Sequence, residues 1–275
     1  MTDPDGASES VTIAITVVDA TVNLLSAVLP ASRSVEVGTT ATAFATLINA
    51  GSADALGCGL RLPSSVAGDF FYQASDASTN AVIGERNIPV DIPAGASQSF
   101  VFGITPSDEL SGAEVAIEFQ CANATEAASF VGLNTLLLTA SFAPVPDLIA
   151  LAATLTNNGV TELNNNSGFF SASTVNVGAA ATITVSADTG DATLPVTLSL
   201  CQTDPATSVC INPTVPGIEP VLVDISEGGS PTFAVFVSAT DNIVLDPVNS
   251  RVFLRFSDEL GVIRGSTSVA LENTP

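Results

Sequence analysis

Histidine and tryptophan are absent from this 275-residue chain, and methionine and tyrosine occur once each. Without histidine, the chain has no side chain that ordinarily gains and loses a proton near neutral pH, and it lacks the commonest nitrogen ligand for metals. Aromatic residues make up 5% of the chain, whereas ligand-binding surfaces are usually richer in them. These absences favour a scaffold over a catalytic protein.

Positive charge is also scarce, because six Lys and Arg residues stand against 28 Asp and Glu, which gives a net charge of −22. Such a chain is unsuited to nucleic acid, whose phosphates require basic patches, and to anionic membrane surfaces. Two interpretations of the acidity remain: solubility in a salty exterior, or binding of divalent cations by some of the carboxylates. No apolar run approaches the roughly 20 residues of a membrane span, so we expect no membrane insertion.

Short phrases recur in the same order in the two halves of the chain. "VDIPAGASQSFVF" (90–102) returns as "VDISEGGSPTFAVF" (223–236), at an offset similar to those of the other phrases, about 133 to 140 residues. The other three pairs are "VGTTATAFATLINAG" with "VGAAATITVSADTG", "AEVAIEFQC" with "SRVFLRFSD", and "GLNTLLLTAS" with "GSTSVALENT". Repetition of ordered phrases predicts that a whole domain is duplicated.

Apolar and polar residues alternate inside these phrases, which is typical of half-buried strands. The alternation matches residues 41–47 with 181–187, and 56–60 with 196–200. Turn signals such as "PAG", "EGG" and "DTGD" separate the strands. We therefore predict an all-β chain of two tandem Ig-like antiparallel β-sandwiches, residues 21–143 and 144–275, joined by the short, stiff linker "FAPVPD" (142–147).

Residues 1–20, "MTDPDGASESVTIAITVVDA", lack the charged and apolar regions of a signal peptide. "DPDG" followed by an alternating strand resembles the last hairpin of the cadherin-like repeats of large bacterial surface proteins. The two copies, through "VDIPAGASQSFVF", "PVPDLIALAAT" and "VNVGAAATITVSADTG", resemble tandem Ig-like modules of bacterial secreted proteins. The resemblance implies a segment of a longer chain, with neighbouring domains as partners and an extracellular or cell-surface location.

Four cysteines are expected to pair within the copies. In an Ig-like sandwich, Cys58 at the start of strand C lies beside Cys121 at the end of strand F, within disulfide reach. Cys201 and Cys210 would close a small loop after strand C of the second copy. Four free buried thiols in a cytosolic protein, or a zinc site, are the alternatives, although the spacing is not a metal pattern.

The sequence contains no set of residues that predicts catalysis, so we expect no enzyme and no catalytic residue. Calcium is the candidate cofactor, with candidate ligands beside a tight turn and near a domain junction. Aromatic side chains in one segment are candidates for ligand binding, and the alternative is that they plug an end of the sandwich. The calcium candidates are Asp3, Asp5, Asp19, Asp188 and Asp191, and the ligand-binding candidates are Phe70, Phe71 and Tyr72.

The resulting hypothesis is a non-enzymatic stalk, spacer or adhesive segment of a bacterial surface protein. The alternatives are a module that binds a surface glycan or protein through loops at a sandwich end, and a subunit of a self-assembling filament whose edge strands pair.

Overall fold

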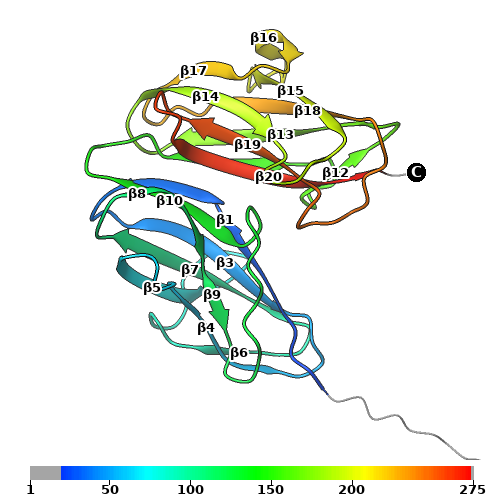
Figure 1. Ribbon diagram of the computed structural model, residues 1–275. Coiled ribbons are helices and arrows are strands. Elements are labelled where there is room, and N and C mark those ends of the chain that lie inside the picture. Colours follow the sequence, from blue (N-terminus) through cyan, green and yellow to red (C-terminus); the bar gives the residue numbers. More distant parts are fainter. Residues whose placement is uncertain (1–19, 274–275) are drawn as a thin grey trace, which may run out of the picture.

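The computed structural model describes residues 20–273, and it is all-β, with no helix in that span. The predicted fold class is confirmed: the strands form sheets that are stacked as two sandwiches, one after the other along the chain (Figure 1). Each sandwich has a hydrophobic core of its own, drawn from residues 24–138 in the first and 148–271 in the second.

The first sandwich has one sheet in the order β1-β3-β7-β5. Its other layer joins β2-β10-β8 to β6-β4-β9, because β9 continues β8 after a single intervening residue. The strands are β1 (Leu24–Leu29), β2 (Ser32–Glu36), β3 (Ala41–Asn49), β4 (Ala55–Arg61), β5 (Gly68–Ser75), β6 (Val90–Ile92), β7 (Ser97–Pro106), β8 (Leu110–Ala116), β9 (Glu118–Gln120) and β10 (Thr135–Ser141).

The second sandwich has the sheets β11-β13-β18-β15-β16 and β12-β20-β19-β14-β17. Its strands are β11 (Leu148–Ala153), β12 (Val160–Leu163), β13 (Ser167–Asn176), β14 (Ala181–Asp188), β15 (Val196–Thr203), β16 (Cys210–Gly217), β17 (Val221–Ile225), β18 (Thr232–Ala239), β19 (Arg251–Ser257) and β20 (Ile263–Asn273). The strand orders of the two sandwiches match position by position, apart from the extra edge strand β16.

The matching topology supports three of the four sequence echoes and corrects the fourth. Strands β6, β7, β8/β9 and β10 take the places of β17, β18, β19 and β20, as the phrases indicate. However, β3 corresponds to β13 and not to β14, while β4 corresponds to β14 and not to β15. Apolar residues alternate in all of these strands, so the pattern located the strands correctly. It could not distinguish neighbouring strands, and it therefore matched β3 and β4 each with the strand that follows the true equivalent.

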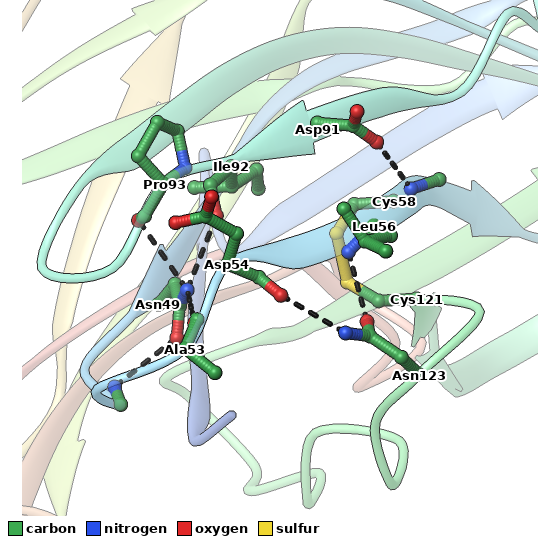
Figure 2. The surroundings of a disulfide bond; sticks show 12 residues. Asn49, Ala53, Asp54, Leu56, Cys58, Asp91, Ile92, Pro93, Cys121 and Asn123 are labelled. Carbon is green, nitrogen blue, oxygen red and sulfur yellow. Dashed lines mark hydrogen bonds between the residues drawn. A yellow bond between two sulfur atoms is a disulfide. The ribbon is translucent and has the colours of Figure 1, made fainter. Parts of the chain in front are cut away.

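Buried asparagines mark the correct match. Asn49 ends β3 and Asn176 ends β13, and each side chain is fully buried. Asn49 donates to the carbonyls of Ala53, Ile92 and Pro93 at 2.8, 3.1 and 3.3 Å (Figure 2), which ties the end of its strand to the turn before β7. Asn176 makes the equivalent bonds, to the carbonyl of Ala179 after its own strand and to those of Ile225 and Ser226 before β18. Buried amides of this kind must be hydrogen-bonded, since an unmet donor costs about 1–3 kcal/mol.

The expected antiparallel pairing holds except at two places. Strand β2 pairs with β10 in parallel, and β12 pairs with β20 in parallel. In each copy the first strand is split: β1 pairs with β3 in one sheet, and the chain then crosses to the other sheet as β2 without reversing. The crossing segment therefore meets the last strand of the sandwich in the same direction.

Alternating side chains fill the cores. On β3, every second residue from Ala41 to Asn49 is buried. Phe100 and Phe102 of β7 are fully buried in the first core, and Phe233 packs edge-on against Phe256 in the second, with ring centroids 5.4 Å apart. Each such ring contributes about 1.5–3 kcal/mol through removal from water. The cores hold each sandwich together independently of the other.

Candidate functional site

The two sandwiches pack against each other through the sheets that carry β10 and β20. A strand in a two-layer sandwich normally buries alternate residues. On β10, the first six residues are all buried, and on β19 the first four are. In Figure 1, β10 of the first sandwich lies below β20 of the second, and both β2 and β10 contact β20. The outward faces of these two sheets are therefore covered by each other.

Asp147, the last residue of the linker, connects both sandwiches. Its carboxylate accepts hydrogen bonds from Nε and Nη2 of Arg33 at 3.0 and 2.8 Å and from the backbone N–H of Ser34 at 2.9 Å. Its own N–H donates to Oδ1 of Asn176 at 3.1 Å. The side chains of Arg33 and Asp147 are 10% and 4% exposed. The ion pair is thus removed from water and anchors the linker to β2 on one side and to β13 on the other.

Hydroxyl groups connect the facing sheets beyond this ion pair. The backbone N–H of Ser266 donates to Oγ of Ser32 at 2.6 Å, and Oγ of Ser34 donates to the carbonyl of Arg264 at 3.3 Å. Thr139 of β10 donates through Oγ1 to the carbonyl of Ile263, also at 3.3 Å. These bonds fix the register of β20 against β2 and β10.

Arg251 of β19 lies at a second contact between the sandwiches. Its Nε and Nη2 donate to Oγ of Ser268, at 3.2 and 2.8 Å, and this hydroxyl donates in turn to the carbonyl of Gly132 at 2.9 Å. Burial lowers the pKa of Arg251 below its usual range. Gly132 has φ of +76°, and a Cβ at this position would come within 2.4 Å of the Phe253 ring. The contact therefore requires glycine at this position.

Four of the six basic residues of the chain lie in or beside this interface. Arg33 binds Asp147 of the linker, and Arg251 holds Ser268, whose hydroxyl reaches the first sandwich. Arg255 pairs with Asp188 at 2.7 Å and Arg264 pairs with Asp258 at 2.8 Å. In a protein of net charge −22, two acidic domains repel each other unless positive charge is placed between them. The arginines neutralise carboxylates where the domains meet, which reduces that repulsion.

Asp188 and Asp191, two of the calcium candidates, flank the turn after β14. One carboxylate oxygen of Asp188 accepts from Nε of Arg255, and the other accepts from the N–H of Gly190 at 2.8 Å. Asp191 is exposed. Within residues 20–273, no three His, Cys, Asp or Glu side chains are grouped closely enough to hold a metal ion. The candidates Asp3, Asp5 and Asp19 lie outside the described residues.

The aromatic candidates of β5 face different ways. Phe70 and Tyr72 pack against core phenylalanines of β7, with ring centroids 6.1 and 5.8 Å apart, and burial raises the pKa of Tyr72. Phe71 is on the outer face, where the guanidinium of Arg86 lies 3.9 Å from its ring centroid. The structure therefore does not bring the three rings together as one binding surface.

The first cysteine pair joins neighbouring strands of one layer. Cys58 of β4 and Cys121, next to β9, form a disulfide with Cα atoms 4.0 Å apart (Figure 2). Beside it, Asn123 accepts from the N–H of Leu56 and donates to the carbonyl of Asp54, at 2.8 and 2.9 Å. The disulfide and this amide together close the end of the β4–β9 pair.

The second disulfide, Cys201–Cys210, has Cα atoms 5.6 Å apart and joins β15 to the edge strand β16. Its place differs from the expected one, because β15 is the fourth strand of its sheet and not the equivalent of strand C. No free cysteine is present in the described part of the chain.

Sequence reasoning missed the interface and its central residue, Asp147. The available signal was the "RVFLRF" run of β19, whose apolar residues fall on both faces of the strand. Two-sided burial produces such runs. The serines and threonines of β2 and β20 carried no comparable signal, since they resemble ordinary solvent-facing strand residues.

Comparison with protein-family models finds no match, and none of the curated proteins matches. Among solved structures, the N-terminal domain of PorA has a TM-score of 0.28 at 9% identity, over 46% of this chain and 97% of that one. The adhesin InvE of Yersinia pseudotuberculosis has a TM-score of 0.26 at 11% identity, over 91% of this chain and 60% of that one. A Porphyromonas gingivalis W83 protein of unknown function has a TM-score of 0.26 at 10% identity, over 91% of this chain and 99% of that one. At these scores the likenesses carry no argument about function.

No helix in residues 20–273 is long and apolar enough to cross a membrane.

Proposed function

We propose that this chain is a non-enzymatic structural segment, a stalk or spacer, of an extracellular bacterial surface protein. The observation that carries the proposal is the buried contact between the sandwiches, centred on the Arg33–Asp147 ion pair. A spacer must hold its two ends at a fixed separation, and this contact restrains the angle between the domains as well as the length of the linker.

The hydrogen-bonding pattern supports a fixed arrangement. Inter-domain contacts within a chain are usually polar and permit relative motion unless they are large. Here the last residue of the linker, Asp147, is bonded to both sandwiches, and hydroxyl-to-backbone bonds fix the facing strands. Hinge motion would break the bonds of Asp147 and the hydroxyl-to-backbone bonds together, at about 0.5–1.5 kcal/mol for each hydrogen bond, so the bent-away states are sparsely populated.

The disulfides support an extracellular location. Disulfides persist in oxidising compartments and are rare in the cytosol. Both pairs lie within one sandwich each, so they stabilise the separate domains while the ion pair couples them. The acidic surface is consistent with a segment that stays soluble among other surface proteins.

Small-angle X-ray scattering tests the spacer role. The wild-type curve is expected to fit the rigid two-sandwich arrangement without added conformations. A variant with six Gly-Ser residues inserted after Phe142 is the matched control, because it loosens the linker and leaves both cores unchanged. A wild-type curve that needs the same broad ensemble as the insertion variant contradicts the proposal.

A further inference from the structure

The outer face of the second sandwich carries a groove of about 490 Å³ over strands β13, β18 and β15. At one end, Phe169 of β13 lies beside Phe236 of β18, with ring centroids 6.1 Å apart and the Phe169 ring 45% exposed. The next row across the sheet has small side chains, Ser171, Ala234 and Cys201, which stand opposite one another in register. The small row makes the hollow, and the two rings form one of its ends.

Hydroxyl groups form the other end of the groove. Oγ1 of Thr203 and Oγ1 of Thr232 lie 2.7 Å apart, and Ser173 follows across the sheet. Pro205 and Ser208, in the turn between β15 and β16, form a side wall. The Cys201–Cys210 disulfide fixes β16 to the floor strand at the base of this turn. The wall is thus held in place covalently.

The first sandwich provides an internal comparison, because larger side chains stand at the equivalent positions of its sheet. The row that corresponds to Ser171, Ala234 and Cys201 is Phe44, Val101 and Gln73, in the same register. Larger side chains fill the position of the hollow there. The turn after β5 has the same hydrogen bonds as the turn after β15, yet Val82 stands where Cys210 stands in the second copy. Hollow and disulfide therefore occur together in the second copy.

From this geometry we propose that the groove binds a neutral oligosaccharide. Aromatic rings stack on the C–H faces of sugar rings through dispersion and polarisation, and serine and threonine hydroxyls exchange hydrogen bonds with sugar hydroxyls. No charged side chain lines the groove. The net charge of −22 repels anionic ligands, so the ligand class is uncharged.

An extended peptide fits the groove less well than a sugar. Peptides bound to β-sheets usually pair with an exposed strand edge, whose backbone donors and acceptors supply the affinity. The strands under this groove are paired on both sides: β13 with β11 and β18, and β15 with β18 and β16. The groove therefore offers side chains alone, as a sugar site requires.

This site is separate from the interface between the sandwiches, and it stands or falls independently of the spacer role. It differs from the earlier expectation of loops at a sandwich end, because it lies on a sheet face. The ligand class and the face together make the proposal testable with one set of variants.

The test is a titration of the full chain, followed by ¹H–¹⁵N NMR, with neutral tetrasaccharides of glucose, galactose, mannose and N-acetylglucosamine. At least one is expected to shift the amide signals of Ser171 and Thr232 in a saturable way. Phe169→Ala is expected to weaken that binding tenfold or more, and Ser171→Phe, which fills the hollow as Phe44 does in the first copy, is expected to abolish it. Phe44→Ala, which removes a comparably exposed ring from the first sandwich, should leave binding unchanged.

Each outcome decides the proposal, provided that the variants melt at the wild-type temperature. Absence of saturable shifts with all four sugars at 10 mM overturns it. Equal weakening by Phe169→Ala and Phe44→Ala overturns the assignment to this face. Saturable binding of uncharged Ser/Thr-rich peptides to the same amides, without sugar binding, overturns the ligand class.

Discussion

Replacement of Asp147 by asparagine is expected to uncouple the two sandwiches. The asparagine keeps the size of the side chain and removes its charge, so Arg33 is left buried with no carboxylate partner. Loss of one partner from a buried ion pair costs about 3–5 kcal/mol. The pair qualifies as buried because its side chains are 10% and 4% exposed. For a cooperative unit of about 150–250 residues, a loss of 3 kcal/mol corresponds to a fall of roughly 6–12 °C in melting temperature.

A surface ion pair of the same chain serves as the matched control. Arg61 and Glu118 are 2.7 Å apart, but their side chains are 67% and 25% exposed. Exposed pairs contribute about 0–1 kcal/mol because water and salt screen them, so Glu118→Gln should barely shift the melt. The double variant Arg33→Met with Asp147→Asn should recover part of the loss, since it leaves no unpaired charge.

Differential scanning calorimetry measures these changes. The wild type is expected to melt in one transition, and Asp147→Asn in two overlapping transitions at lower temperature. A shift for Asp147→Asn no larger than that for Glu118→Gln refutes the reasoning, because it means that the buried pair contributes no more than an exposed one.

Three further predictions concern the disulfides, acid stability and calcium. On the chain-entropy model, replacing both cysteines of the 58–121 disulfide with alanine should lower the free energy of unfolding by about 4 kcal/mol. The same replacement at the 201–210 disulfide should lower it by about 2.6 kcal/mol. Urea unfolding measures both losses, and a reversed order contradicts the model's ranking. Hydrogen bonds from the side chains and N–H groups of Ser78 and Thr79 lower the pKa of Asp76 from 3.8 to about 2. The stabilising contribution of the Asp76 carboxylate is therefore complete above pH 3.8 and is lost as the pH falls toward 2. Asp76→Asn should flatten the plot of unfolding free energy against pH between those values. An unchanged plot is inconsistent with this role of Asp76. Melts of the non-reduced protein in EDTA and then in millimolar Ca²⁺ decide the calcium hypothesis: it requires a rise of several degrees, and an unchanged melt leaves the acidity as a solubility feature.

The strand content and the places of most echoed strands could be predicted from sequence, because strands such as β3 and β17 bury alternate residues and leave a period-two pattern. The same pattern cannot tell one strand from the next, which is why residues 177–190 were matched with β3. Side chains with individual roles would have set the register correctly. Asn49 and Asn176 each cap a strand through the same bonds, and Asp76 and Asp204 begin equivalent turns.

The candidate sites were harder to predict, since they depend on which outward faces are covered. Arg33, Asp147 and the serines of β2 resemble solvated residues in the sequence, and only the packing of the sandwiches places them out of water. The groove exists because the side chains of Ser171 and Ala234 are small. Small residues on a strand leave no pattern that distinguishes a hollow from a flat surface.

Residual dipolar couplings test the central claim, the fixed arrangement of the two sandwiches, most directly. Backbone N–H couplings are measured in one weakly aligned sample and fitted separately for residues 24–141 and 148–273. The account predicts one alignment tensor, with the same magnitude and orientation for both sandwiches in the frame of the structure. Two tensors that differ in magnitude would show independent motion of the domains and would contradict the account.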